Sequence, residues 1–223
     1  GVLHGELTGP VNAALNGVSF NIDLMEGHKT GTYLDQQINH ALVANHCADK
    51  RVLDCFTFQG GFALHAAKAG ASEVLGLDQS EEALTQARAN ALANDLKATF
   101  EQSNVFDWLK KNSGNEVHKF DVVILDPPSF TRNRASVPDA LRGYKEIHLR
   151  ALRLLPPSGL LATFCCSHHV DDDLFLDTIL SAAADARKVL RLRERFWQSP
   201  DHPVVPAIRE TEYLKGFLLE VLP

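Results

Sequence analysis

The sequence predicts an α/β fold: a Rossmann-like, doubly wound sheet of seven mostly parallel strands with an antiparallel C-terminal hairpin, preceded by a short β segment. Three observations predict it. From about residue 51 the chain alternates short β-rich runs with helical patterns. Most of these runs are strongly apolar, as in strands that helices cover on both faces. The last two runs follow each other without a long helix between them, which indicates a hairpin.

The expected strands are short apolar runs that end at a polar residue or a turn. The run 51–56 (RVLDCF) is followed by a pair of glycines, and the run 73–77 (EVLGL) ends at Asp78. The run 120–125 (FDVVIL) ends at Asp126 and two prolines. The remaining strands are expected at 98–102, 159–165, 189–197 and 212–222, the last two joined by a proline-rich loop.

The expected helices lie between these runs. Ser80 can cap a helix that extends to about residue 94, and the two acids that follow it suit the positive end of the helix dipole. Gly70 closes the helix 62–69, and Asp residues occupy the first turn of the helix 171–186. Further helical patterns cover residues 33–46, 105–112 and 138–155.

The N-terminal segment differs from the rest of the chain. Residues 16–24 alternate weakly between apolar and polar side chains, as a hairpin strand does. We therefore expect residues 1–31 to be the remnant of a small upstream β domain and residues 32–223 to form the main domain. The first residue is Gly rather than Met, which suggests a fragment whose upstream part is missing.

Composition and charge exclude several classes of protein. Of the 223 residues, 45% are hydrophobic and 22% are charged, as in soluble globular proteins. No apolar run approaches the roughly 18 residues of a membrane span and no signal stretch opens the chain, so we expect a cytoplasmic protein without membrane contact. The four cysteines form no C-x-x-C pair, which disfavours zinc and favours free thiols. A net charge of −6 disfavours nucleic-acid binding unless a local basic face or another domain supplies cations.

Polar residues at the expected strand ends form a candidate cofactor site. Asp54, Asp78, Asn104 and Asp126 lie where ligands bind in an open α/β sheet. The glycine pair after the first strand lets the backbone approach a ligand at a helix N-terminus. A carboxylate such as Asp78 can accept both hydroxyls of a ribose, and an amide such as Asn104 can bond an adenine edge.

The loop after the first strand disfavours a dinucleotide. It lacks the G-x-G-x-x-G pattern, and Asp54 would repel a pyrophosphate. The same acid suits a cationic amino-acid group, such as the methionine end of S-adenosylmethionine. Each strand-end residue alone also fits a structural role as a turn or cap residue, and only their common register favours a cofactor site.

Seven short motifs support a more specific interpretation: residues 27–36 (GHKTGTYLDQ), 54–62 (DCFTFQGGF), 126–130 (DPPSF), 142–145 (RGYK), 163–167 (TFCCS), 201–203 (DHP) and 213–217 (YLKGF). They resemble class I S-adenosylmethionine-dependent methyltransferases, and within these the bacterial ribosomal RNA large-subunit cytosine-5 methyltransferases. The resemblance covers residues 16–223. Gln37 stands where the family usually has Arg and Ser129 where it usually has Lys, and the family's N-terminal PUA RNA-binding domain is absent from this chain.

The resemblance implies roles for the residues at matching positions. Cys166 and Asp126 would be catalytic. The cofactor S-adenosylmethionine would contact Asp54, Phe56, Gly60, Asp78, Ser80, Asn104, Val105, Asp126 and Tyr33. The substrate side would include Lys29, Gln36, Pro127 and Tyr144. The expected partners are ribosomal RNA, bound with the help of an upstream domain, and a second copy of the chain in a homodimer. No metal is implied.

Methylation at carbon 5 of a pyrimidine explains why a cysteine is expected beside the cofactor strands. Carbon 5 of a pyrimidine is a poor nucleophile until a thiolate adds to carbon 6, after which carbon 5 can attack a sulfonium methyl group. Successive strand residues point to opposite sides, so one of Cys165 and Cys166 should be buried and the other should face the cleft. The resemblance assigns the nucleophile to Cys166 and core packing to Cys165. We expect the adjacent His168 and His169 to be solvated rather than metal ligands.

Two alternatives stay open. The first is an exocyclic N-methyltransferase acting on a nucleic-acid base, which has an aromatic residue directly after its proline pair, whereas Ser129 intervenes before Phe130 here. An exocyclic N-methyltransferase would also leave Cys166 without a role. The second is a non-catalytic cofactor-binding or RNA-binding module, which the intact set of strand-end acids with Cys166 disfavours.

Overall fold

A seven-stranded sheet forms the centre of the computed structural model, which describes residues 4–6, 9–25, 31–114, 120–131 and 133–223. The strand order is β5-β4-β3-β6-β7-β9-β8. The bounds are β3 (Arg51–Cys55), β4 (Glu73–Asp78), β5 (Thr99–Gln102), β6 (Val122–Leu125), β7 (Leu160–Cys165), β8 (Leu190–Trp197) and β9 (Lys215–Val221). The first five in the order are parallel, and β9 is antiparallel to both neighbours. The predicted Rossmann-like sheet with a C-terminal hairpin is confirmed.

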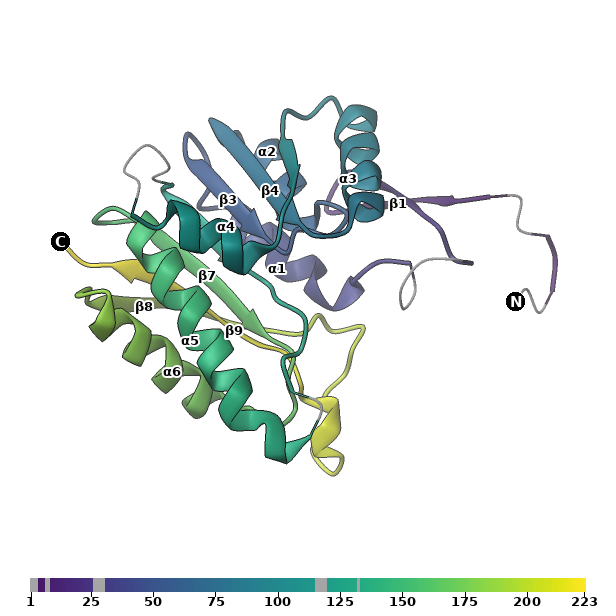
Figure 1. Ribbon diagram of the computed structural model, residues 1–223. Helices are drawn as coiled ribbons and strands as arrows, with labels where there is room; N and C mark the ends of the chain where they lie inside the picture. Colours follow the sequence, from purple (N-terminus) through teal and green to yellow (C-terminus); the bar gives the residue numbers. More distant parts are fainter. Residues whose placement is uncertain (1–3, 7–8, 26–30, 115–119, 132) are drawn as a thin grey trace.

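Helices cover both faces of the sheet (Figure 1). One face packs against α4 (Val105–Asn112), α5 (Val137–Leu154) and α6 (Asp172–Asp185). The other face packs against α1 (Gln37–Ala44), α2 (Gly61–Lys68) and α3 (Glu81–Ala93). Short 3-10 turns cover Leu34–Gln36, Arg134–Ser136 and Arg209–Thr211. Among the described residues, no helix is long and apolar enough to cross a membrane.

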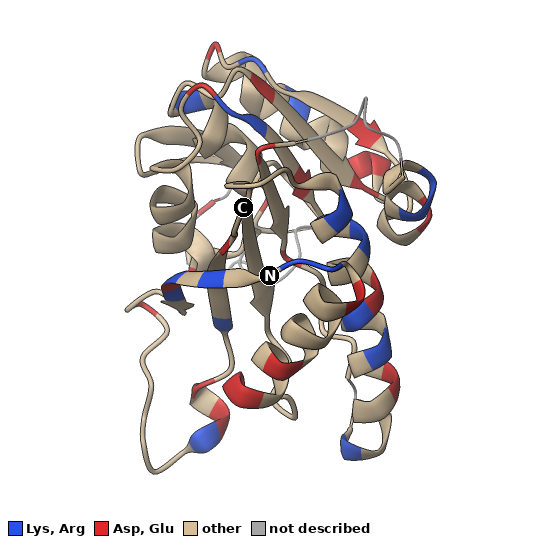
Figure 2. Cartoon of the chain, turned by 90° about the vertical axis from the view of Figure 1, so that its left-hand side faces the viewer, with Lys and Arg blue, Asp and Glu red and all other residues tan. Residues whose placement is uncertain are grey.

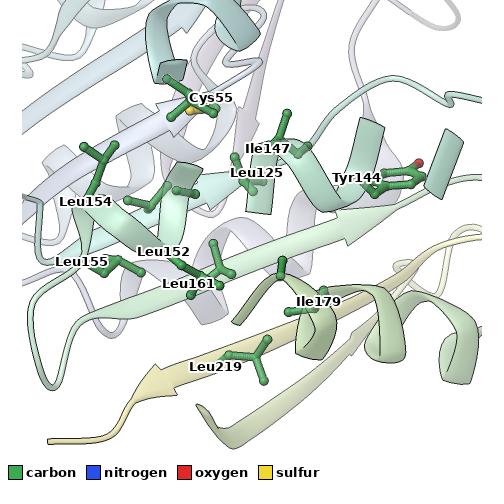
Figure 3. Close-up of a cluster of buried hydrophobic side chains, with 14 of the residues drawn as sticks. Cys55, Leu125, Tyr144, Ile147, Leu152, Leu154, Leu155, Leu161, Ile179 and Leu219 are labelled. Atoms are coloured by element: carbon green, nitrogen blue, oxygen red, sulfur yellow. The ribbon is translucent and has the colours of Figure 1, made fainter. Parts of the chain in front are cut away.

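The larger core lies under α5 and α6. Figure 3 shows Leu125 of β6, Leu161 of β7 and Leu219 of β9, which lie in one cluster with Ile147 of α5 and Ile179 of α6. All five side chains are at most 1% exposed. Burying one such side chain stabilises the fold by about 1.5–3 kcal/mol. This packing fixes the strands whose carboxyl ends carry the candidate site.

The N-terminal hairpin is a separate two-stranded sheet that packs onto the main domain. It consists of β1 (Val11–Leu15) and β2 (Val18–Ile22), and its inward residues Val18, Phe20 and Ile22 are at most 5% exposed. The Asn94 side chain bonds both the backbone N–H and the carbonyl of Ser19 (2.8 and 2.7 Å). This segment therefore completes the core beside α2 and α3. Its assignment to an upstream domain stays a prediction.

Among the predicted boundaries that shift, two have clear local reasons. The helix expected from residue 33 begins as the 3-10 turn Leu34–Gln36 and becomes α-helical at Gln37. The last strand begins at Lys215 rather than at 212, because the backbone N–H groups of Tyr213 and Leu214 bond the Gln198 side chain instead of β7. Both changes lie beside the candidate site.

Candidate active site

The carboxyl ends of four parallel strands bring the expected functional residues to one edge of the sheet. Asp54 in β3 lies opposite Gly76 in β4, and the next pair across β3 and β6 is Cys55 with Leu125. Leu125 in turn pairs with Thr163 of β7. Asp78, Asp126 and Cys166 end or follow these strands, so the register brings them to the same edge.

Asp54 holds the loop between β3 and α2. It is completely buried, and its Oδ2 accepts hydrogen bonds from the Thr57 hydroxyl (2.5 Å) and the Ala63 N–H (2.9 Å). Its Oδ1 is buried and has no hydrogen-bond partner among the described residues. Burial raises the pKa of this carboxyl to about 7, although both hydrogen bonds lower it. A buried carboxylate oxygen without a partner fits the cationic amino group of S-adenosylmethionine.

The loop after Asp54 has an unusual backbone. Phe56, Phe58 and Gly60 have φ values of 65°, 50° and 87°, in the left-handed region that non-glycine residues rarely adopt. Gly61, the second glycine of the pair, is explained by helix packing rather than by the expected approach of a ligand. A Cβ at Gly61 would lie 2.7 Å from the His40 ring, so Gly61 permits close packing of α2 on α1. Close approach to a ligand is therefore not needed to explain this glycine.

Asp78 orients the loops on both sides of itself. Its Oδ2 accepts the N–H of Phe58 and its Oδ1 accepts the N–H of Ser80, both at 2.9 Å. Ser80 caps α3 through the N–H of Ala83 (3.2 Å). Each carboxylate oxygen retains a second lone pair, so Asp78 can still accept the hydroxyls of a ribose.

Asn104 and Val105 have structural roles at the start of α4. The Asn104 side chain accepts hydrogen bonds from the N–H groups of Phe106 and Asp107 and so caps the helix. An adenine contact would therefore come from its amide nitrogen. The Val105 side chain is 3% exposed and packs in the core, which leaves its backbone for a ligand.

Tyr33 lies at the point where the cofactor edge and the expected catalytic residues meet. Burial raises its pKa, and the negative charges of Asp126, Cys166, Asp35 and Asp78 raise it further. The ring also packs edge-on against Phe58 in the β3–α2 loop, at 5.2 Å between centroids.

Gln36 connects this turn to the end of β6. Its side-chain nitrogen donates to Asp126 Oδ1 at 3.0 Å, and the side chain is 3% exposed. The neighbouring Pro127 is buried. Lys29, the other residue expected on the substrate side of this motif, lies outside the described residues.

The two adjacent cysteines have opposite environments. Cys165 is completely buried and its sulfur lies 3.3 Å from the Tyr144 hydroxyl, whereas Cys166 is half-buried. The alternation predicted for this strand end is thus observed. Tyr144 is also completely buried, and its hydroxyl bonds the Ser167 hydroxyl at 3.1 Å. Its expected substrate contact does not fit this position, because the ring supports the turn after Cys166 from inside the core.

Sequence reasoning missed two supports of the site. Ser129, on the loop after β6, bonds the Ser167 hydroxyl at 2.9 Å and so connects the Asp126 loop to the Cys166 loop. The buried Lys215 ammonium donates to the carbonyls of Ser167 (3.0 Å) and Val170 (2.7 Å). The signal for Lys215 was available, since a lysine within an apolar strand needs partners.

The histidine pair after Ser167 lies on the surface. His168 and His169 are both exposed, and the His168 ring lies 5.7 Å from the Tyr213 ring. Within the described part of the chain, no group of three or more His, Cys, Asp or Glu side chains could hold a metal ion.

Comparisons with known proteins agree with this geometry. The family described as S-adenosylmethionine-dependent methyltransferase matches residues 2–218. The ribosomal RNA large subunit methyltransferases I of Tolumonas auensis and Vibrio vulnificus are 41% and 42% identical to the chain. Each alignment covers 100% of this chain but only 57% of the relative, so the chain spans little more than half of their length.

Solved structures show the same architecture. A crystal structure described as that of a methyltransferase complexed with SAH has a TM-score of 0.87 and 25% identity, and covers 99% of this chain and 58% of that one. An S-adenosylmethionine-dependent methyltransferase from Agrobacterium tumefaciens has a TM-score of 0.74 and 19% identity over 98% of this chain and 72% of that one, which supports the fold alone. With the family match, the strand-end acids and the fold in agreement, the chain belongs to the S-adenosylmethionine-dependent methyltransferases.

Proposed function

We propose that this chain is the catalytic part of an RNA methyltransferase that forms 5-methylcytidine in large-subunit ribosomal RNA. One observation carries the proposal: the half-buried Cys166 follows β7 at the same sheet edge as Asp126 and the cofactor acids. The names of the most similar relatives support ribosomal RNA as the substrate. An exocyclic N-methyltransferase would have no use for a thiol at this position.

The chemistry assigns a separate task to each group. S-adenosylmethionine supplies an electrophilic methyl group on a sulfonium. The Cys166 thiolate adds to carbon 6 of cytosine while N3 takes up a proton. Carbon 5 of the resulting enamine then bonds the methyl carbon as that carbon's bond to sulfur breaks, and S-adenosylhomocysteine leaves. Loss of the carbon 5 proton to a base then expels the thiolate and restores the aromatic ring. Asp126 accepts a hydrogen bond from the N4 amino group of the base and, once N3 is protonated in the adduct, a second one from N3–H, which stabilises the protonated ring.

RNA binding is expected to need more cations than this chain offers. The net charge is −6, and Figure 2 shows acidic and basic residues interspersed along the helices. We therefore propose that an additional RNA-binding domain contributes to affinity, in agreement with the greater length of the relatives. Ribosomal RNA as substrate implies a cytoplasmic location. A homodimer stays a prediction, which light scattering of the purified protein can test.

The test is mass-spectrometric nucleoside analysis of ribosomal RNA from cells that lack the protein. Loss of one 5-methylcytidine, restored by the unmodified gene, is the expected result. Loss of an N-methylated base would instead support the alternative enzyme, and no change would support a non-catalytic module.

The two cysteines provide a matched pair of variants for the mechanism. Cys166→Ala should abolish methylation and leave S-adenosylmethionine affinity nearly unchanged, because the thiol is needed for the base and not for the cofactor. Cys165→Ala should remain active and lose only packing stability. RNA with 5-fluorocytidine at the target should trap a covalent adduct, since no proton is available on carbon 5. Peptide mapping of that adduct to Cys165, or methylation by Cys166→Ala, would overturn the mechanism.

A further inference from the structure

Asn39 is a buried polar residue that the chemistry above does not use. It lies in the first turn of α1 and is 1% exposed. Its side-chain nitrogen donates to the Gln36 side-chain oxygen at 2.6 Å and to the Trp197 carbonyl at 2.9 Å. Both acceptors are oxygens, so they fix which end of the Asn39 amide carries the hydrogens.

Asn39 thereby fixes the orientation of Gln36. The Gln36 oxygen receives the hydrogen bond from Asn39, which leaves its nitrogen to donate to Asp126 Oδ1 at 3.0 Å. The reversed Gln36 amide would set its oxygen against the Asp126 carboxylate and its NH2 group against that of Asn39. The chain from Trp197 through Asn39 and Gln36 to Asp126 therefore has a single direction.

Residues after β8 and before β9 also hold the turn that carries Gln36. The N–H of Ser199 donates to the Asp35 carbonyl (2.9 Å), and the N–H of Ile38 donates to the Ser199 hydroxyl (3.2 Å). The Tyr213 hydroxyl donates to Asp35 Oδ2 at 2.7 Å. With the backbone fixed at these points, the orientation of the Gln36 amide depends on the group at position 39.

We propose that Asn39 is a positioning residue for base selection. It directs Gln36 to donate to Asp126, so Asp126 stays an acceptor towards the base. An acceptor favours cytosine, whose N4 amino group donates, over uracil, whose O4 accepts. This inference rests on the proposed function, because it assumes that Asp126 contacts the target base.

Asn39→Asp tests the inference with almost no change in shape. A carboxylate at position 39 cannot donate, so the Gln36 amide should reverse and direct its oxygen at Asp126. The preference for cytosine over uracil should then fall by about tenfold or more, the effect of losing one well-placed hydrogen bond to a charged group. The protein is assayed on two transcripts of its mapped target that carry 5-fluorocytidine or 5-fluorouridine, and adduct formation rates give the ratio. S-adenosylmethionine affinity should stay within about twofold, because the cofactor loops are untouched.

Asn112→Asp is the matched control. Asn112 is also buried, at 7% exposure, and donates to the Trp108 carbonyl at 2.8 Å within α4, away from this turn. It should keep the cytosine preference of the unmodified protein. An Asn39→Asp protein with an unchanged ratio would overturn the inference.

A second variant tests the direction of the hydrogen bonds independently. In Asp126→Asn, the new amide should accept from Gln36 through its oxygen and so turn its NH2 group to the base, which shifts preference towards uracil. In the double variant Asp126→Asn with Asn39→Asp, the reversed Gln36 should turn that amide round and shift preference back towards cytosine. No shift in either variant would overturn the inference. A protein that traps no cytosine adduct even when unmodified would instead refute the proposed function.

Discussion

Asp54 should make the affinity for S-adenosylmethionine depend on pH near neutrality. Burial raises the pKa of this carboxyl to about 7, while hydrogen bonds from Thr57 and Ala63 lower it. Within the part of the chain that the structure describes, its Oδ1 accepts no hydrogen bond. A cationic ligand group near that oxygen favours the ionised form, so binding should lower the pKa and release a proton.

The magnitude follows from the pKa in the free protein. If the complex requires ionised Asp54, the apparent affinity scales with the ionised fraction. For a pKa of about 7, this fraction is about 9% at pH 6 and about 91% at pH 8. Affinity should therefore rise about tenfold from pH 6 to pH 8, and about half a proton should be released on binding at pH 7. S-adenosylmethionine should bind more weakly at acidic pH, because protonated Asp54 is neutral and no longer attracts the cationic amino group.

Isothermal titration calorimetry in two buffers of different ionisation enthalpy measures both quantities. Asp54→Asn can still accept from Thr57 and Ala63, so its affinity should change much less between pH 6 and pH 8. Asp121→Asn is the matched control, since Asp121 accepts the Arg51 N–H (2.9 Å) at the opposite end of the sheet. The amino group of the ligand titrates near pH 8, so only about half of it is cationic at that pH, and the tenfold gain from Asp54 should be observed as about fivefold. This loss of ligand charge is common to all three proteins. Equal pH dependence in Asp54→Asn and the unmodified protein, or no proton release at pH 7, would refute the reasoning.

Asp78 and His148 give two further predictions. Asp78→Ala should weaken S-adenosylmethionine binding by about 1.5–3 kcal/mol in the same calorimetric assay, the scale of hydrogen bonds to a charged group, and unchanged affinity would remove Asp78 from the ribose site. His148 is completely buried between the Tyr144 carbonyl and the Thr163 hydroxyl, and burial lowers its pKa to about 4. An unfolded histidine titrates near pH 6.5, so the contribution of His148 to the unfolding free energy is present above pH 6.5 and is lost as the pH falls towards 4; this single contribution should drop by about 2 kcal/mol from pH 7.5 to pH 5. Urea unfolding at both pH values should show a smaller drop for His148→Gln, and equal drops would contradict the assignment.

The sheet and the strand-end residues could be predicted because they depend on local patterns. The apolar run at 120–125 and the polar residues that follow it predict both a buried strand and a site at its end. The alternation of side chains along a strand predicts that Cys165 and Cys166 differ in burial, and they do. These features need only the neighbouring residues and the period of the strand.

Other features of the site depend on contacts between distant segments and leave little trace in the sequence. From the sequence, close approach of a ligand explains the glycine at position 61, whereas in the structure the His40 ring leaves no room for a side chain there. The amide of Asn39 is oriented by the Trp197 carbonyl at the end of β8, which lies 158 positions further along the chain. Without that distant contact, Asn39 would not orient Gln36 towards Asp126. Tyr144 lies in a motif with expected substrate residues, yet the packing of α5 on β7 buries it completely.

The position of Cys166 is set by contacts from three directions. Tyr144 on α5 and Ser129 after β6 both bond the Ser167 hydroxyl, and Lys215 on β9 bonds the carbonyl of the same residue. A buried ammonium is costly unless polar groups surround it, so the carbonyls it bonds and the lysine stabilise each other. A thiol next to a turn held in this way has little freedom to move towards a base within an RNA helix. Under the proposed function, the target base must therefore leave its stack to reach Cys166, as in other enzymes that modify bases.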